Sequence, residues 1–437
     1  MLSERDNERL TRVGPGTPMG ELFRRYWLPC VLSSELPADG PPLRLRLLGE
    51  DLVAFRDSNG EVGVLEAYCP HRRALLFWGR NEECGLRCVY HGWKFDVRGR
   101  CVDMPSEPAS SNFKSKVQAK AYPTRERAGL VWVYMGPGEL EPDFPQYEWT
   151  LVPEGQRVVR KWFQDSNWLQ SLEGDIDTAH VSFLHRWFNL ETAPPTPQFV
   201  SGYRRLVALD TAPRLTVHET QYGFVYGGRR TIGPDQYYWR LTQWLAPSSS
   251  QTPSTYTRNA RILVPIDDYT SFSCGVTYNL QRPLEAGEGE ISGRPVRPQR
   301  IRLRDGYIID GWVSELTRDN DYGLDREFQR TKKFSGIDSG PVDEDRAMTE
   351  TMGPIVDRSK EHLGTSDVAI IAARRRLLRM LRELEQGIEP YAVRHPESFR
   401  CRSLEVVSSC AELSEVVAEH ASHLAAEDLS PTSAPAV

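Results

Sequence analysis

The sequence has few of the features that would place a protein in a membrane or on a nucleic acid. None of its apolar runs approaches the roughly 18 residues of a membrane-spanning helix, and its charged first residues show no signal peptide. The formal net charge is -6, whereas nonspecific nucleic-acid binding needs clustered basic surface. We therefore expect a cytoplasmic protein that binds neither a membrane nor nucleic acid.

Nucleotide motifs and a disulfide framework are also missing. Residues 14–20 are rich in glycine and proline, but their spacing is wrong for a dinucleotide site, so they predict a turn before a helix at residues 21–27. With no flavin or nicotinamide motif, any electrons must come from a separate reductase. Six of the eight cysteines are scattered irregularly, and we expect them to be reduced and mostly buried. They are Cys30, Cys84, Cys101, Cys274, Cys401 and Cys410.

Two short pairs of cysteine and histidine are the most informative feature. Only Pro70 separates Cys69 from His71, and a Cys-x-x-His pair follows at Cys88 and His91. Two thiolates and two imidazoles can hold a Rieske [2Fe-2S] cluster, in which neutral nitrogen ligands raise the potential from roughly -400 mV to about -150 to +300 mV. Structural zinc also accepts Cys and His, but its ligand pairs are usually two to five residues apart. We interpret the site as Rieske, with zinc and unligated core cysteines as alternatives.

A second set of metal-ligating residue types stands downstream in the spacing Asp-x-x-His-x4-His. Asp177 and His180 are three residues apart and would share one face of a helix, whereas His185 is five residues further and would point well round it. Convergence of the histidines therefore needs a wide turn or a π-bulge, a distortion that is common at functional sites. Two imidazoles and one carboxylate form the facial site of non-haem Fe(II) oxygenases, which leaves three positions open.

The carboxylate of such a site can come from an acidic segment far along the chain. Asp343, Glu344 and Asp345 crowd together at the start of a stretch that can be helical. Their spacing alone does not choose among them. An acidic helix start is also favourable in itself, because carboxylates interact well with the helix dipole.

Taken together, these sets make the sequence closely resemble the oxygenase component of Rieske non-haem iron ring-hydroxylating oxygenases. The resemblance is to the phthalate dioxygenase type, whose catalytic subunit works without a small β partner, and it covers most of the chain. Four motifs carry it, in the order that the family has them. They are Cys69-Pro70-His71-Arg72, Cys88-Val89-Tyr90-His91-Gly92-Trp93-Lys94-Phe95, residues 167–185, and residues 320–322 through 352–367.

The resemblance implies a ligand set for each metal group. The implied cluster ligands are Cys69, His71, Cys88 and His91. The implied ligands of a mononuclear Fe(II) that uses O2 as cosubstrate are His180, His185 and Asp345. Asp345 is chosen because the family's liganding Asp stands five positions before a Glu, as Asp345 stands before Glu350. Asp343 and Glu344 remain the fallback choices.

The resemblance also implies a catalytic role for Asp177 and a set of partners. Asp177 matches an acid that bridges an iron-ligating histidine and a cluster histidine of the neighbouring subunit. Electrons would then cross a subunit boundary, which requires a homotrimer, or a hexamer of stacked trimers. The electron source would be an NADH-dependent iron-sulfur flavoprotein reductase. One position departs from the family pattern, because Arg73 stands where relatives commonly have Gly, and it could favour an acidic redox partner or simply lie in solvent.

Length and patterning predict an α+β protein of more than one domain. At 437 residues the chain exceeds the usual single-core limit of about 250 to 300 residues. We expect an N-terminal helical segment at residues 1–40 packed on the catalytic domain, and an antiparallel β Rieske domain at residues 41–150, with a proline-rich boundary at residues 136–145. A helix-grip catalytic domain, a curved antiparallel sheet with a late helix near residues 368–384, would fill residues 151–395. Residues 396–437 would form an extension with a disordered end.

The expected function is that of a terminal oxygenase in aromatic catabolism, which hydroxylates an aromatic substrate. The expected substrate is an aromatic carboxylate, and the expected reaction is dioxygenation. Monooxygenation with O- or N-dealkylation or diaryl-ether cleavage is the alternative, and a noncatalytic Rieske electron carrier with a ligand-binding domain is a remote one. Arginines of the sheet can pair with a carboxylate in bidentate fashion. The candidates are Arg204, Arg205, Arg229, Arg230 and Arg240. The basic helix that contains residues 374–376 is a packed surface helix or a reductase-docking site.

Overall fold

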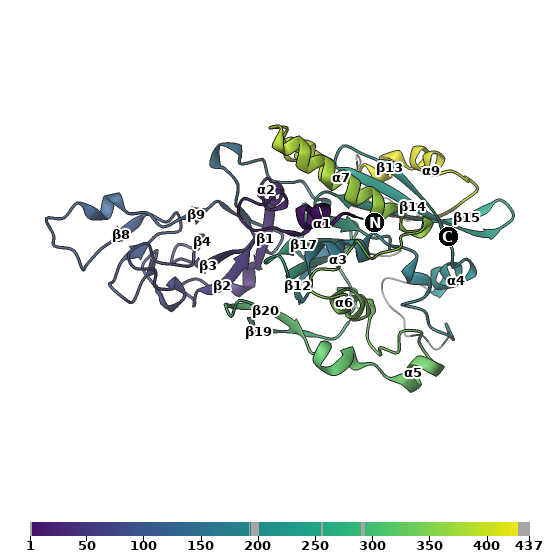
Figure 1. Ribbon diagram of the computed structural model, residues 1–437, viewed down its shortest axis with the longest axis horizontal. Helices are drawn as coiled ribbons and strands as arrows, with labels where there is room; N and C mark the ends of the chain where they lie inside the picture. The colour runs from purple at the N-terminus through teal and green to yellow at the C-terminus, as the bar shows by residue number, and fades with distance from the viewer. Residues whose placement is uncertain (1, 192, 194–200, 255–256, 290–292, 427–437) are drawn as a thin grey trace.

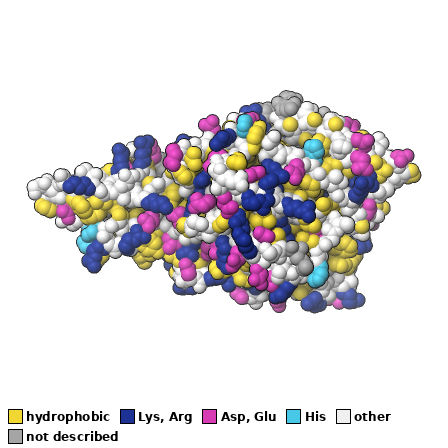
Figure 2. Space-filling view, turned by 45° about the horizontal axis from the view of Figure 1, so that its top comes forward, with side chains coloured by type: hydrophobic (Ala, Val, Ile, Leu, Met, Phe, Trp, Pro, Cys, Tyr) yellow, Lys and Arg dark blue, Asp and Glu magenta, His cyan; other side chains and the backbone are white. Residues whose placement is uncertain are grey.

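The computed structural model is an elongated molecule with a narrow and a broad end (Figure 1). It describes residues 2–191, 193, 201–254, 257–289 and 293–426, and only the backbone of residues 201–204. The segment for which we expect a disordered end, residues 427–437, lies outside the described residues. Basic and acidic side chains are interspersed on the face drawn in Figure 2, and hydrophobic and histidine side chains are exposed at the narrow end.

The narrow end consists of short antiparallel strands. One sheet has the order β2-β3-β4-β9 and another the order β5-β6-β7-β8. The strands are β2 (Leu43–Leu47), β3 (Glu50–Arg56), β4 (Val62–Glu66), β5 (Arg80–Asn81), β6 (Leu86–Arg87), β7 (Lys94–Phe95), β8 (Cys101–Asp103) and β9 (Ala121–Tyr122). Val53, Phe55 and Leu65 of the first sheet pack with Leu86 and Phe95 of the second. The two Cys-His loops, which follow β4 and β6, therefore stand on one small core.

A third sheet and a hairpin join the two ends of the molecule. The sheet has the order β1-β11-β10, with β1 at Trp27–Leu32, β10 at Thr124–Arg127 and β11 at Leu130–Tyr134. The hairpin of β19 (Val296–Arg302) and β20 (Ile308–Ser314) contacts both β2 and β12. The side chains of Arg44 and Asp310 form an ion pair between them, with the Nη2 and Oδ1 atoms 3.1 Å apart. The end that carries the two Cys-His loops is thus fixed to the broad end.

The broad end is built on one long antiparallel sheet, as the sequence predicts. Its order is β12-β18-β17-β16-β15-β14-β13, and β21 pairs with β15 as the eighth strand. The strands are β12 (Arg157–Gln164), β13 (Arg214–Glu219), β14 (Gly223–Gly233), β15 (Gln236–Leu245), β16 (Ser249–Gln251), β17 (Arg258–Pro265), β18 (Ser271–Tyr278) and β21 (Leu404–Ser408). Residues 238–245 of β15 are all buried, so both faces of the sheet are covered there.

Helices cover this sheet and carry the functional segments. The helices are α1 (Glu4–Thr11), α2 (Pro18–Phe23), α3 (Trp168–Asp175), α4 (Ser201–Leu209), α5 (Arg326–Thr331), α6 (Pro341–Thr351), α7 (Val368–Glu385), α8 (Tyr391–Arg394), α9 (Leu413–Glu419) and α10 (Ala421–Leu424). The long helix α7 contacts β13 and β14, and α1 and α2 contact α7 (Figure 1). None of the helices in the described part of the chain has both the length and the apolar character needed to cross a bilayer.

One helix expected from the sequence is placed differently. The expectation was a helix at residues 21–27, whereas α2 starts at Pro18 and ends at Phe23, and Trp27 begins β1. Pro18 at the first helical position is preorganised for a helix start, and the Thr17 side chain caps the amide of Gly20. Trp27 of the expected helix is therefore used in a buried strand.

Candidate metal centres

The segment that carries the two histidines leaves its helix before it reaches them. α3 ends at Asp175, so Asp177 and His180 do not share one face of a helix. That expectation from the sequence is wrong. Instead, the Oδ1 atom of Asp177 accepts the amide of Ala179 at 2.7 Å, a turn that competes with helix formation. His180 then opens a single 3-10 turn at His180–Ser182. The chain meets the need for a distortion with this tight 3-10 turn rather than with the expected wide turn or π-bulge.

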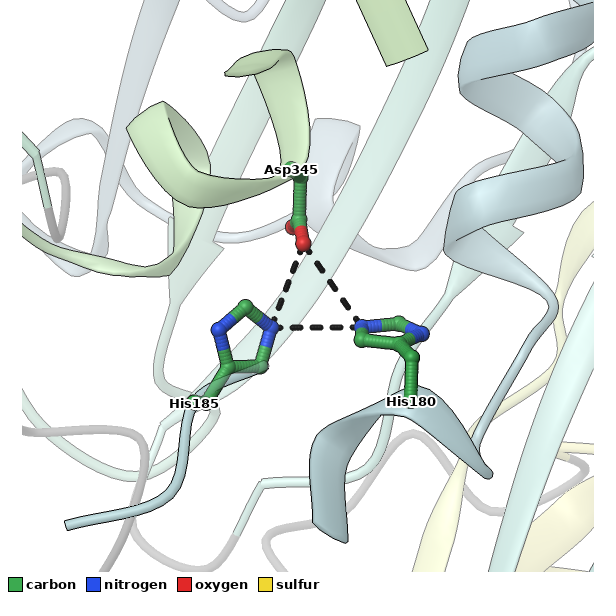
Figure 3. Close-up of side chains that lie close together, drawn as sticks. All are labelled: His180, His185 and Asp345. Atoms are coloured by element: carbon green, nitrogen blue, oxygen red, sulfur yellow. Dashed lines mark hydrogen bonds and ion pairs between the residues drawn. The ribbon is translucent and has the colours of Figure 1, made fainter. Parts of the chain in front are cut away.

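This turn brings His180 and His185 together with Asp345 of α6 (Figure 3). The Nε2 atoms of the two histidines are 3.2 Å apart. The Oδ1 atom of Asp345 lies 3.2 Å from the Nε2 of His185 and 3.6 Å from that of His180. Donor atoms bound to one ion at about 2.1 Å and at right angles lie about 3 Å apart. The three side chains therefore fit a single metal ion, and their two nitrogens and one oxygen are the donor set of a non-haem Fe(II) site.

The electrostatics of the three side chains are tightly linked. Burial alone would lower the pKa of His185, but the Asp345 and Glu344 carboxylates outweigh it and raise the pKa to about 9. For Asp345, burial would raise the pKa, but the neighbouring histidines hold it below its usual range. The Asp177 carboxylate is shifted in the same direction, because the hydrogen bond and charge of His180 lower its pKa against the effect of burial. Each imidazole of the site thus has an acid beside it.

Helix geometry separates the three candidate acids of α6. Successive residues of an α-helix point about 100° apart, so the three neighbouring acids have different surroundings. Asp343 accepts from Ser314 Oγ at 3.1 Å and from Arg346 Nη1 at 3.2 Å. Glu344 lies on the other side of His185, against its Nδ1 atom at 2.9 Å. Asp345 alone faces the Nε2 atoms, so neither fallback acid joins the group.

Arg230 supports the turn that carries the histidines. Its side chain is fully buried, and its Nη2 atom donates to the carbonyl of Thr178 at 3.0 Å and to Ser182 Oγ at 3.1 Å. Desolvation lowers the pKa of Arg230 to about 10. This arginine, proposed from the sequence as a partner of a substrate carboxylate, is instead hydrogen-bonded to the protein's own backbone.

The two Cys-His loops have the same turn geometry. The amide of Arg73 donates to the carbonyl of Cys69 and that of Gly92 to the carbonyl of Cys88, each at 2.9 Å. Both thiols are buried, and a hydrogen bond between them lowers the pKa of Cys88. The equivalent turns place two sulfur donors side by side at the base of the loops.

The histidines of these loops complete a mixed donor set. The rings of His71 and His91 are 4.3 Å apart, and His71 stacks on Trp93 at 4.2 Å. The Nδ1 atom of His71 is buried and has no hydrogen-bond partner among the described residues. A buried nitrogen without a partner is rare, and a metal bond would satisfy it. The residues present therefore fit a Rieske cluster.

Arg73 is exposed to solvent, as one of the two expectations had it, but its side chain also has partners within the protein. Its backbone is left-handed, with φ at 61°, which explains why Gly suits this position. Its Nη2 atom contacts the carboxylate of Glu66 at 2.5 Å, and its guanidinium lies 4.7 Å from the ring centre of Tyr68. The side chain thus ties the cluster loop to the end of β4.

A cavity of about 140 Å³ opens beside His180, His185 and Asp345. An apolar cavity of about 150 Å³ can hold benzene, so the space suits a single aromatic ring. Its apolar lining includes Val158, Trp162, Val181, Tyr226, Ala260, Val276 and Val342, and its charged lining includes Arg160, Asp175, Arg240 and Arg261.

Two arginines of the cavity have acidic partners within the protein. Arg240 donates to Glu405 at 2.7 Å, and Arg261 donates to Asp175. Arg240 is among the arginines proposed from the sequence, whereas Arg160 and Arg261 are not. A charged residue within an otherwise apolar strand is the signal that could have identified these two. Of the other candidates, Arg229 lies over Tyr237 with its guanidinium 4.6 Å from the ring centre, Arg205 does not line the cavity, and the side chain of Arg204 lies outside the described residues.

Comparisons with known proteins match both parts of the chain. A family model described as Rieske [2Fe-2S] domain matches residues 26–123, and one described as LigXa C-terminal domain like matches residues 133–407. The 3-chlorobenzoate-3,4-dioxygenase oxygenase subunit of Comamonas testosteroni is 40% identical over 91% of this chain and 93% of its own. The phthalate 4,5-dioxygenase oxygenase subunit of Pseudomonas putida is 42% identical over 89% of this chain and 88% of its own.

A solved structure shares the fold. The crystal structure of dicamba monooxygenase bound to dicamba has a TM-score of 0.55 and 18% identity over 83% of this chain and 98% of its own. The Rieske match confirms the iron-sulfur interpretation of the Cys-His pairs over zinc. On these grounds the chain belongs to the Rieske non-haem iron aromatic ring-hydroxylating oxygenases, as a catalytic (alpha) subunit of the phthalate dioxygenase type.

Proposed function

We propose that this terminal oxygenase hydroxylates an aromatic carboxylate with a single ring, by dioxygenation. The observation that carries the proposal is the cavity of about 140 Å³ that touches the His180, His185 and Asp345 group and contains three arginines. The names of two relatives support the substrate class, since one acts on 3-chlorobenzoate and the other on phthalate.

We assign the residues to their roles as follows. Cys69, Cys88, His71 and His91 hold the cluster, and His180, His185 and Asp345 hold the Fe(II). When bound, the cluster supplies single electrons and the Fe(II) activates dioxygen next to the substrate. Asp177 keeps the Nδ1 side of His180 occupied, with its Oδ2 atom 3.5 Å away, and so leaves Nε2 for the metal.

The cavity walls would bind and orient the substrate. The apolar side chains exclude water from the ring, and the charged side chains attract a carboxylate to one end. Because Glu405 and Asp175 already bind Arg240 and Arg261, a bound carboxylate would share these arginines with acids rather than neutralise isolated cations. Such sharing limits affinity and makes binding depend on the position of the carboxylate.

Monooxygenation is the second candidate function, and the comparisons give it a specific basis. A 5,5'-dehydrodivanillate O-demethylase oxygenase subunit of Sphingobium is 33% identical over 90% of this chain and 84% of its own. A protein similar to this chain over most of its length is therefore named for dealkylation. A noncatalytic electron carrier would not need the converging His180, His185 and Asp345.

We also propose the partners of the enzyme. A separate NADH-dependent flavin and iron-sulfur reductase would deliver the electrons, and the subunits would form a homotrimer or a hexamer of stacked trimers, in the cytoplasm. Trp78, Val89 and Tyr90 beside the cluster loops are 69%, 58% and 54% exposed. Exposed apolar groups of this kind usually mark an interface, which supports docking of the cluster end on another protein surface.

The test is a screen of benzoates, phthalates and aryl methyl ethers with a surrogate reductase and labelled dioxygen, with products read by mass spectrometry. We expect a ring diol with label in both hydroxyl groups. His180→Ala should lower product formation by at least about 100-fold, whereas the control His218→Ala, at an exposed position of β13, should keep it. Full activity of the His180→Ala variant would overturn the catalytic assignment.

A further inference from the structure

Behind His185, on the side away from the metal position, lies a buried pair of opposite charges. Glu344 and Lys333 have side chains that are 0% and 3% exposed, and the Oε2 atom of Glu344 is 3.0 Å from Lys333 Nζ. The same Oε2 atom lies 2.9 Å from the Nδ1 of His185. Ser335 Oγ donates to the other oxygen, Oε1. Each oxygen of this carboxylate is therefore held by named donors, and one of them is shared by a lysine and a metal-facing histidine.

The main chain ties Lys333 to the same histidine loop. Trp187 and Lys333 form an isolated antiparallel bridge, with Phe188 N donating to Lys332 O and Phe334 N donating to Arg186 O, each at 2.9 Å. The segment that carries Lys333 thus runs beside the residues that directly follow His185. Lys333 itself is fixed by its bonds to the carbonyls of Ile337 at 3.3 Å and Ser339 at 2.7 Å.

This arrangement determines which nitrogen of His185 can bind a metal. A carboxylate can only accept, so the proton of the neutral ring lies on Nδ1 and the lone pair of Nε2 faces Asp345. A lone buried carboxylate would be costly, and removal of one partner of a buried pair leaves an uncompensated charge. Lys333 cancels the charge of Glu344 at the oxygen that meets the histidine, so the protein can place this acid next to Asp345.

We propose that Glu344 and Lys333 are positioning residues that fix the tautomer and the orientation of His185 for metal binding. The inference rests on the proposed role of His180, His185 and Asp345 as metal ligands. Glu344 acts on the metal through His185, and Lys333 acts through Glu344. Glu344, which the sequence offers as a possible metal ligand, thus positions the ligand His185 instead.

The experiment measures the affinity of the mononuclear site for Fe(II) by anaerobic titration of cluster-loaded protein, with Co(II) absorption as a spectroscopic readout. Glu344→Ala should weaken Fe(II) binding by about 10 to 100-fold and shift the Co(II) d–d bands. Glu344→Gln should recover most of this loss, because its amide oxygen still accepts from Nδ1. Glu350→Ala is the matched control, since Glu350 is an equally buried acid of α6 held by Tyr322 Oη at 2.6 Å and Arg346 Nε at 3.0 Å.

Lys333→Met tests the second half of the pair. It should weaken Fe(II) binding by about 10-fold in the parent protein, but change it by less than about twofold in the Glu344→Ala background, since coupled residues are not additive. Equal Fe(II) affinity in the parent and Glu344→Ala proteins, or an equal loss in Glu350→Ala, would overturn this inference but leave the proposed metal site intact. A parent protein that binds iron only in its cluster would instead overturn the proposed metal site.

Discussion

Arg73 shows how one side chain can offset the strain of its own backbone. A non-glycine residue in the left-handed region costs roughly 1 to 2 kcal/mol, and Arg73 has φ at 61°. Its half-exposed ion pair with Glu66 and its contact with the Tyr68 ring contribute on the order of 1 kcal/mol together. The two effects nearly cancel, so the departure from the family's Gly carries little net cost.

This balance gives a prediction for two substitutions at residue 73. Arg73→Ala keeps the strained backbone and loses both contacts, whereas Arg73→Gly loses the contacts and relieves the strain. We expect the Ala variant to be less stable than the Gly variant by about 1 kcal/mol. The measurement is the midpoint of denaturant unfolding, monitored by the visible absorbance of the cluster. The opposite order of the two variants would contradict this account of the loop.

At the residue scale, the sequence revealed the types of side chain but not their directions. The Cys-x-His and Cys-x-x-His spacings favoured the cluster over zinc, since each pair lies within one tight loop, and the Rieske family match confirmed this interpretation. The third member of the iron site was different, because Asp343, Glu344 and Asp345 are equivalent by composition. Their directions depend on where α6 sits against His185, which is a tertiary property. Lys333 was not found, because a single lysine in a loop resembles any surface residue.

At the scale of elements, the strands and the late helix α7 could be predicted from alternation and length. The need for a distortion near His180 could be predicted too, but not its form as a 3-10 turn. From their spacing, Asp177 and His180 were expected on one face of a helix. The Asp177 carboxylate instead accepts a hydrogen bond from the amide of Ala179, which competes with a helix there. Short side chains that bond their own backbone compete with helix formation in a way that periodicity does not show. Function here depends on an irregular segment between regular ones.

The packing of the C-terminal elements gives a prediction of pH dependence. His423 of α10 lies 3.3 Å from the carbonyl of Ser403, and burial together with the nearby Arg258 and Arg402 lowers its pKa to about 4. Between the unfolded value of about 6.5 and this lower value, the unfolded chain binds more protons than the folded one. Stability should therefore fall as the pH decreases through that window.

We expect His423 to contribute on the order of 1 kcal/mol to this loss between pH 7 and pH 5, because partial exposure screens the effect. His423→Gln should lose less stability than the parent protein over the same interval, as measured by urea denaturation at each pH. His395→Gln is the control, since the His395 side chain is 43% exposed. An unchanged pH dependence in His423→Gln would show that other groups cause the acid sensitivity.

The whole molecule places its two metal centres in different parts of an elongated chain. The sheet that contains β8 lies at the narrow end, whereas α3 and α6 lie within the broad end (Figure 1). One continuous core nevertheless runs through the junction, from Leu52 of β3 to Leu263 of β17. The class of fold could be predicted from the sequence, but this arrangement could not, since it depends on contacts between residues far apart in the chain. The separation of the two ends along an elongated protomer supports the proposed electron transfer between neighbouring protomers.

Electron transfer between protomers predicts that two inactive variants restore each other. Cys88→Ser removes a proposed cluster ligand and His180→Ala a proposed iron ligand, so each variant alone should be inactive. In a ring of head-to-tail contacts, the cluster of a His180→Ala protomer can serve the intact iron of a Cys88→Ser neighbour. A mixed ring of three protomers, which contains both variants, has one productive contact among its three. Co-expressed, differently tagged chains purified through both tags should show about that fraction of parental oxygen incorporation, whereas transfer within one chain leaves the mixed oligomers as inactive as either variant.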